Sequence, residues 1–290
     1  MTAISFFYPV SALEIQCWYL NLPWLLLGVA TSAALIRPAW GIWIALPAVA
    51  AAAVIGVLTP WYALLVVLAG YLLHFTDRLS TTGVISVHIG VSLFVLASGL
   101  HLIPGAAPLI VIADYQKTAD SMLYTLGFSF DKTLAPLALM IIMPAMVLTK
   151  KCGHSLPVLL AVIAGGILSI LLLAWATGFI KPDVAVPGWT GLFILKMICY
   201  TAFAEEVFFR GYVQNLLTAR WGPTVGVIIA AVLFGVAHSG GGVTLVVLSS
   251  LAGIVYGLSY HLSGRLWTAV AVHTALNTAH LILFTYPAAA

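Results

Sequence analysis

Long apolar stretches dominate the pattern of this chain, and short breaks rich in proline, glycine or charged residues separate them. Apolar runs of about 17–25 residues have the length that a helix needs to cross the hydrocarbon core of a membrane. The pattern therefore predicts an all-α fold, a polytopic integral membrane helical bundle with about ten spans and no fewer than about eight. The expected spans are 21–36, 40–58, 61–76, 84–103, 133–149, 156–179, 190–218, 223–238, 243–262 and 266–285.

The breaks between the runs predict two kinds of connection. Some combine proline with glycine or a polar residue, which is typical of a tight turn between antiparallel helices, since proline cannot continue a helix. These turns are expected at Arg37-Pro38, Thr59-Pro60 and Trp221-Gly222-Pro223. The longest polar interruption, residues 105–132, is expected to form a short amphipathic helix or a lid beside the membrane.

Composition narrows the class of protein further. The chain is 63% hydrophobic and only 7% charged, with a mean hydropathy of +1.14, whereas soluble domains are about 45–50% apolar. A secreted or cytosolic globular protein is therefore excluded, and no basic patch indicates a nucleic-acid partner. We expect a multi-pass integral membrane protein of a prokaryotic cytoplasmic membrane, surrounded by the lipid bilayer, and the sequence gives no indication of its oligomeric state.

The basic residues between the runs predict an orientation in the membrane. Alternating spans place one group on the same side, namely Arg37, Arg78, Lys150, Lys151, Arg220 and Arg265. Lys117, Lys132 and Lys181 fall on the other side. The first side is expected to be cytoplasmic, because cytoplasmic loops carry the excess of lysine and arginine.

Three charged residues cluster inside the apolar run 190–218, where a charged side chain costs several kcal/mol and usually faces a partner or a cavity. Glu206 and Arg210 are four positions apart, so on a helix they share a face and can neutralise each other. A purely structural ion pair explains these two equally well. Glu205 is rotated by about 100° from Glu206. With no partner on its own helix, Glu205 is expected to present a free carboxylate to a cavity.

Later apolar runs carry further polar side chains. His238 ends one run beside a glycine-rich stretch, and His273 and Asn277 share one face of the last run. An imidazole and an amide side by side are suitable donors for a developing oxyanion. A histidine at the end of a span is more often interfacial, and paired polar residues often form hydrogen bonds between helices. Only their combination with the glutamates favours a catalytic site.

These residues form three motifs in order: E-E-V-F-F-R from Glu205 to Arg210, F-G-V-A-H from Phe234 to His238, and H-T-A-L-N from His273 to Asn277. The set closely resembles the CAAX protease and bacteriocin-processing family of intramembrane proteases, also called the Abi family. It matches the family's Glu-Glu-x-x-x-Arg, Phe-x-x-x-His and His-x-x-x-Asn motifs. The resemblance covers roughly residues 190–285.

The resemblance implies a function and roles for these residues, as in the type II CAAX prenyl endopeptidases. It implies an intramembrane endopeptidase in which Glu205 and His238 activate a water, without a cofactor. It assigns His273 and Asn277 to the oxyanion, and Glu206 and Arg210 to support of the site. The expected partner is a membrane-anchored protein or peptide, processed for example at a C-terminal sorting signal or near a lipid anchor.

The division that follows places a CAAX-protease-like core at residues 186–290. Residues 1–185 are expected to be unassigned membrane helices that select substrate or contact partners. The orientation given by the loop charges places His238 towards the extracytoplasmic side and Glu205 near mid-depth, which favours an exported substrate.

Two other classes remain open. A zinc-dependent protease could use the same histidines and carboxylates as a three-ligand site, although no His-Glu-x-x-His helix is present. A non-enzymatic transporter could use buried Glu and His side chains as an ion path, and a catalytically silent immunity protein is a further possibility. Against a transporter, the two halves show no inverted repeat.

Overall fold

The computed structural model describes residues 18–144 and 156–290, and most of them are helical. A first group of helices comprises α1 (Trp18–Ile36), α2 (Pro38–Val54), α3 (Pro60–His74), α4 (Thr81–Gly99) and α5 (Phe130–Ile142). A second group comprises α7 (Leu156–Ala176), α8 (Thr190–Lys196), α9 (Ala202–Glu206), α10 (Asn215–Trp221), α11 (Pro223–Val236), α12 (Gly242–Ser263) and α13 (Leu266–Leu283). Each predicted span thus overlaps a helical segment, although α2, α4 and α7 end three or four residues before the spans expected there. The end of the span 133–149 lies outside the described residues.

The expected tight turns are present. Pro38, Pro60 and Pro223 each stand at the first position of a helix, where the missing proline N–H would have no helical partner in any case. Gly222 joins α10 to α11 with a φ of 85°, a conformation that glycine adopts without the steric cost a side chain would bring. These short connections place consecutive helices antiparallel to each other.

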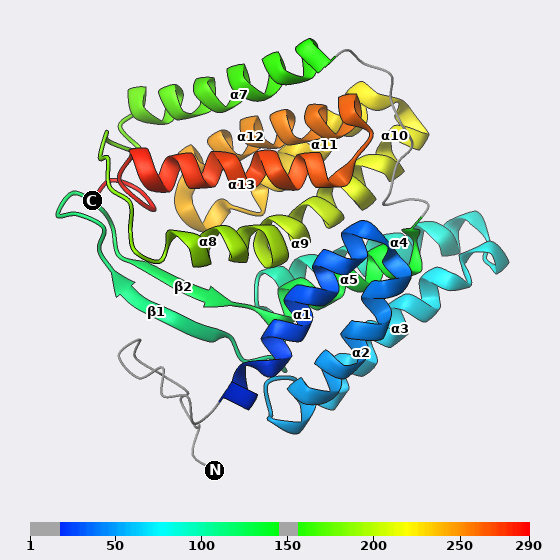
Figure 1. The fold of residues 1–290 in the computed structure, drawn as a ribbon. Helices are drawn as coiled ribbons and strands as arrows, with labels where there is room; N and C mark the ends of the chain where they lie inside the picture. Colours follow the sequence, from blue (N-terminus) through cyan, green and yellow to red (C-terminus); the bar gives the residue numbers. More distant parts are fainter. Residues whose placement is uncertain (1–17, 145–155) are drawn as a thin grey trace.

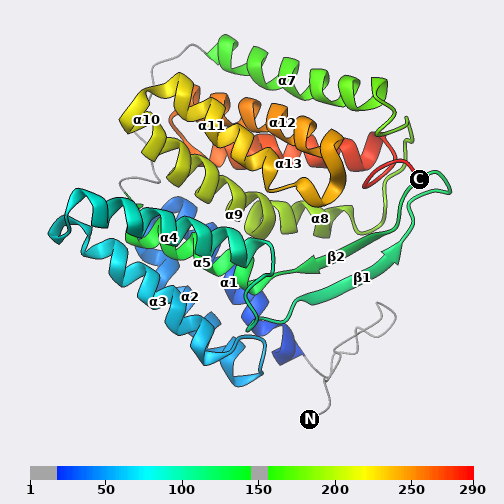
Figure 2. The same cartoon turned by 180° about the vertical axis from the view of Figure 1, so that it is seen from behind.

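The two groups of helices meet at α5 and at the helical run α8–α10 (Figure 1). On one side α5 packs against α1, α2, α3 and α4, and on the other it packs against α9. On the other side of the run α8–α10, helix α12 packs against α11 and α13. Helix α7 covers α12 on the outside (Figures 1 and 2). The helical run that carries Glu205, Glu206 and Arg210 therefore lies at the junction of the two groups.

The polar interruption 105–132 forms a β-hairpin, so the expectation of an amphipathic helix there is wrong. Strand β1 (Leu109–Tyr115) pairs antiparallel with β2 (Tyr124–Phe128), with Leu109 opposite Phe128 and Tyr115 opposite Tyr124. Tyr124 stacks on Trp189 from the segment that leads into α8. A stretch rich in β-branched and aromatic residues gains more from this pairing than from a helix exposed on one face.

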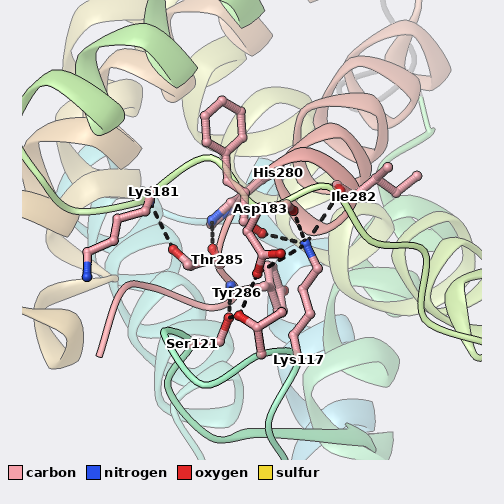
Figure 3. A network of polar contacts seen from close by, with 10 residues as sticks. Lys117, Ser121, Lys181, Asp183, His280, Ile282, Thr285 and Tyr286 are labelled. Carbon is pink, nitrogen blue, oxygen red and sulfur yellow. Dashed lines mark hydrogen bonds and ion pairs between the residues drawn. The ribbon is translucent and has the colours of Figure 1, made fainter.

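A network of polar contacts fixes the hairpin to the end of α13 (Figure 3). Lys117 donates hydrogen bonds from Nζ to the backbone oxygens of Asp183 (2.5 Å), Ile282 (3.4 Å) and Phe284 (2.7 Å). Its side chain is only 2% exposed. Burial lowers the pKa of Lys117, and the nearby Asp183 carboxylate opposes that shift. Tyr286 adds a backbone N–H donated to the Ser121 hydroxyl, so the hairpin and the last residues form one structural unit.

The surface of the helices fits a membrane environment. Among the described residues, four helices are long and apolar enough to cross a membrane, namely Thr81–Gly99, Leu156–Ala176, Ser239–Ser263 and Leu266–Leu283. Many large apolar side chains are exposed on the outside of the bundle, which water would disfavour and lipid tails accept. The chain is accordingly a multi-pass integral membrane protein, and the count of eight to ten spans stays a prediction.

The distribution of charge along the bundle follows the expected alternation. The ends of α1, α3, α10 and α12 all point to the right-hand side of Figure 1, whereas the hairpin lies at the opposite end. The arginines at these four ends are Arg37, Arg78, Arg220 and Arg265. Lys150 and Lys151 lie outside the described residues. The described arginines thus gather at one end of the bundle and the hairpin with Lys117 at the other.

Candidate active site

The two glutamates lie on a helical run in which α-helical and π-helical turns alternate. The short helix α9 (Ala202–Glu206) carries both, with π-helical turns before it (Met197–Thr201) and after it (Val207–Gln214). π-helical turns inside α-helices are rare and frequently mark functional sites. Such turns change the rotation of the side chains that follow, yet Glu206 and Arg210 still meet at a separation of four residues.

Glu206 and Arg210 form the expected ion pair. Arg210 Nε lies 3.1 Å from Glu206 Oε2, and both side chains are completely buried. Arg210 also donates from Nη2 to the Gly253 backbone oxygen (3.1 Å), and its guanidinium lies over the rings of Phe234 and Tyr256. These contacts fix the pair between α9, α11 and α12, because a buried charge is tolerated only with such partners.

His273 extends this pair from α13. Its Nδ1 lies 2.8 Å from Glu206 Oε1, and its Nε2 lies 3.8 Å from Glu205 Oε2. Since a carboxylate can only accept, Nδ1 carries a hydrogen and Nε2 is the nitrogen directed at Glu205. The ring is stacked on Tyr256, with centroids 4.5 Å apart, which fixes its plane. One imidazole therefore links the two adjacent carboxylates.

Glu205 has a partner that the sequence did not reveal. Lys132, in the first turn of α5, donates from Nζ to Glu205 Oε1 at 2.7 Å. The expectation of an unpaired carboxylate is therefore wrong, because a lysine 73 positions earlier in the chain occupies one of its oxygens. The only sequence signal for this residue was its place at the end of the polar interruption. The other oxygen, Oε2, faces His273.

Glu205 and His238 line one cavity of about 170 Å³. Its wall comes from both groups of helices, with Leu96 on α4, Leu100 just after it, Lys132 on α5, and Phe208 after α9. Apart from Glu205, His238 and Lys132, this wall is apolar. The cavity lies among the ends of α4 and α11 and the start of α5, on the side of the bundle that carries the hairpin (Figure 1).

His238 presents one ring nitrogen as an acceptor. Its Nδ1 lies 2.7 Å from the backbone oxygen of Phe234, and since a carbonyl oxygen only accepts, Nδ1 is the donor. In the neutral ring Nε2 then carries the lone pair. A carboxylate and an imidazole acceptor thus meet in one apolar cavity.

Asn277 lies one turn after His273 on α13. Its Nδ2 donates to Met197 Sδ at 3.5 Å, which places the amide against the first π-helical turn. Asn277 is half-buried and His273 is buried. The structure therefore joins Glu205, Glu206, Arg210 and His273 by ion-pair contacts. His238 lines the cavity beside Glu205, whereas the amide of Asn277 contacts Met197 and is not part of the cavity wall. In the part of the chain that the structure describes, no group of three His, Cys, Asp or Glu side chains could hold a metal ion.

Comparison with known families supports the resemblance seen in the motifs. Residues 187–279 match the model of the family described as type II CAAX prenyl endopeptidase Rce1-like. Comparisons with curated proteins and with solved structures found no match. The family match confirms the predicted resemblance to the CAAX protease family over this segment and implies a membrane protease activity. All six motif residues of the candidate site fall within the matched segment.

Proposed function

We propose that this chain, similar over residues 187–279 to type II CAAX prenyl endopeptidases, is an intramembrane endopeptidase that hydrolyses its substrate with an activated water. The observation that carries this proposal is that Glu205 and His238 line the same cavity between apolar helices. A carboxylate among apolar side chains costs several kcal/mol, which favours a functional role. The substrate is a membrane-associated protein.

In this mechanism a water lies between the Glu205 carboxylate and His238 Nε2. Glu205 takes a proton as the water oxygen attacks the carbonyl carbon, and the C–N bond then breaks as the proton passes to the leaving amine. General acid–base catalysis of this kind contributes typically about 10²–10⁴-fold to the rate. The products are a carboxylic acid and an amine, and no acyl-enzyme forms.

Stabilisation of the oxyanion falls to His273 and Asn277. His273 Nδ1 is already bonded to Glu206, so donation from Nε2 requires the doubly protonated ring, with one carboxylate facing each nitrogen. Asn277 can offer its amide hydrogens whatever the charge of that ring. An oxyanion donor in a site without bulk water contributes about 3–4 kcal/mol.

Three further side chains support the site. Glu206 and Arg210 fix His273 and the helix that carries Glu205, as their contacts indicate. Lys132 positions one oxygen of Glu205 and leaves the other directed at His273. This contact comes from the N-terminal segment, which supports a role of residues 1–185 in the site itself beside the protease core at 186–290.

The side of the membrane on which the cavity opens suggests the kind of substrate. The cavity lies towards the hairpin end, and the described arginines Arg37, Arg78, Arg220 and Arg265 gather at the other end. Applying the positive-inside rule makes the hairpin end extracytoplasmic in a prokaryotic cytoplasmic membrane. An exported, membrane-anchored protein with a C-terminal sorting signal fits this orientation better than a substrate lipidated in the cytosol.

The proposal is tested with Glu205→Gln, which removes the charge and keeps the shape. Membranes from cells that express the wild-type chain or the variant are compared by mass spectrometry for new peptide termini. We expect termini that depend on the wild-type chain and decrease at least about 100-fold in the variant, given the contribution of an acid–base group. Unchanged termini in a variant that is folded and present at the same level would refute the mechanism.

Two controls make this result specific. Asp77→Asn makes the same chemical change at an exposed carboxylate outside the cavity, and it should leave cleavage unchanged. Purified wild-type protein treated with a chelator separates the water mechanism from a zinc protease. Cleavage should persist after metal removal, and its loss with recovery on added zinc would favour the zinc alternative.

A further inference from the structure

Outside the candidate peptidase site, a serine, a histidine and an aspartate form a chain of hydrogen bonds. His101 follows the end of α4, and Ser129 and Asp131 lie at the start of α5. His101 Nε2 lies 3.3 Å from Ser129 Oγ, and His101 Nδ1 lies 3.0 Å from Asp131 Oδ2. The two contacts use opposite nitrogens of one ring, as the relay of a serine hydrolase requires.

The hydrogen positions follow from the partners. The Asp131 carboxylate can only accept, so His101 Nδ1 carries a hydrogen and donates to it. In the neutral ring Nε2 then has the lone pair and accepts from the Ser129 hydroxyl. Nucleophile, base and orienting acid are thus arranged in the order that activates a serine.

The aspartate of this chain of contacts is buried and the histidine is exposed, as in a site where a fixed acid orients an accessible base. The Asp131 side chain is only 4% exposed, whereas that of His101 is 51% exposed. Asp131 is further fixed through its backbone oxygen, which accepts from the Tyr62 hydroxyl. The acid is therefore held rigidly inside the protein, while the histidine and the serine remain accessible from outside.

The backbone at His101 is an independent observation. Its φ of 55° lies in the left-handed region, and the N–H of Leu102 donates to the oxygen of Ala97, which closes the end of α4. Glycine or asparagine usually occupies this position of a helix end, since a larger side chain costs about 1–2 kcal/mol there. A histidine occupies the position in spite of this cost, and such strain clusters at functional sites.

Ser129 stands immediately before the first helical residue of α5 and makes no side-chain cap. The first N–H groups of a helix have no helical partner, so those of α5 are available next to the serine oxygen. Backbone N–H groups in this position can stabilise an oxyanion on a carbonyl attacked by that serine. The site therefore combines a nucleophile relay with a set of possible oxyanion donors.

We propose that Ser129, His101 and Asp131 form a second hydrolytic site, which acts on acyl esters of membrane-associated molecules. The Ser129 hydroxyl gives its proton to His101 Nε2 while its oxygen bonds to the ester carbonyl carbon. The C–O bond then breaks, the alcohol leaves with that proton, and a water releases the acid from the acyl-serine. This activity is separate from the proposed peptidase and uses none of its residues.

The choice of an apolar acyl group rests on the surroundings of His101. Leu100 and Leu102 flank it and are 49% and 70% exposed, at the hairpin end of a bundle whose outer surface is apolar. Exposed leucines on both sides of the histidine offer contact to an acyl chain and would be unfavourable towards water. Leu100 also lines the cavity of the peptidase site, so the two sites are neighbours.

A fluorophosphonate probe with an alkyl chain tests the proposal on the purified full-length protein. The activated oxygen attacks phosphorus, a P–O bond forms and fluoride leaves, so the modified residue can be located by mass spectrometry. We expect modification at Ser129, none at this position in Ser129→Ala, and labelling at least about 100-fold slower in His101→Asn. Ser32→Ala removes another exposed hydroxyl and should label at Ser129 like the wild type.

The outcomes separate this proposal from the peptidase. Glu205→Gln should lose peptide cleavage and keep the labelling of Ser129 at the wild-type rate. Absence of modification at Ser129 in folded protein would overturn the second site and leave the peptidase proposal intact. Labelling that is equally fast in His101→Asn and the wild type would also overturn it, because the serine would then react without its relay.

Discussion

Arg210→Met removes one charge from an ion pair that is entirely enclosed by protein. Arg210 and Glu206 are both completely buried, with Nε and Oε2 3.1 Å apart. The substitution keeps an unbranched apolar chain at the position and removes the guanidinium. The Glu206 carboxylate then keeps only His273 as a partner, and the rings of Phe234 and Tyr256 lose the cation that lies over them.

The expected loss is large because the remaining charge cannot reach water. Breaking a buried ion pair by removing one partner costs about 3–5 kcal/mol, whereas replacing both partners by neutral groups is often nearly neutral. A cost of about 3–5 kcal/mol corresponds to about 10²–10⁴-fold in the unfolding equilibrium, at about 1.4 kcal/mol for each factor of ten. The double variant Glu206→Gln with Arg210→Met should therefore recover about half of this loss or more.

The free energy of unfolding can be measured by titration with sodium dodecyl sulfate in mixed micelles, followed by circular dichroism. Arg220→Met makes the same chemical change at an exposed position of α10 and should alter stability by no more than about 0.5 kcal/mol. The reasoning is refuted if Arg210→Met costs less than about 1 kcal/mol. A double variant that is no more stable than Arg210→Met alone would refute it as well.

Two other changes test how the helices and the hairpin are held. In Gly235→Ala the new Cβ would meet Ser250 Oγ and lie 2.5 Å from the Val246 backbone oxygen. Helix α11 must then move away from α12, and the free energy of unfolding should fall by about 1–3 kcal/mol. Gly240→Ala adds a Cβ that points into open space and is the matched control in the same titration. Lys117→Met leaves the backbone oxygens of Asp183 and Phe284 without their side-chain donor, while the oxygen of Ile282 keeps the N–H of Ala185, at a cost of about 1–3 kcal/mol. Faster amide hydrogen exchange in the hairpin is expected, and unchanged exchange would show that Lys117 does not hold it.

Much of the fold could be predicted because a membrane imposes its own thickness on the sequence. A helix that crosses hydrocarbon must be apolar over a fixed length, so the runs and their proline and glycine breaks gave helices at the described positions. The hairpin at 105–132 was missed, since this constraint does not apply outside the hydrocarbon. Its strands are stabilised by pairing with each other and by contacts with Trp189 and the end of α13. These contacts join residues that are distant in the sequence, so the local pattern of apolar residues does not predict them.

The candidate site was only partly accessible from the sequence. The ion pair of Glu206 and Arg210 followed from their separation of four residues, and the structure shows it. The contact of Lys132 with Glu205 did not, because it joins residues 73 positions apart across two groups of helices. The arrangement of Ser129 and His101 was hidden for the same reason, since these residues meet only where α4 ends beside the start of α5.

The order of apolar runs and the three polar motifs thus determined, without any coordinates, that this is a membrane helical protein with a cluster of buried acids and histidines. The tertiary structure alone decided which atoms meet. It placed His273 between two carboxylates, gave Glu205 a lysine partner and enclosed a cavity from both groups of helices. The physical reason is that hydropathy and helix periodicity act over neighbouring residues, whereas charge pairing and cavities depend on how distant helices pack.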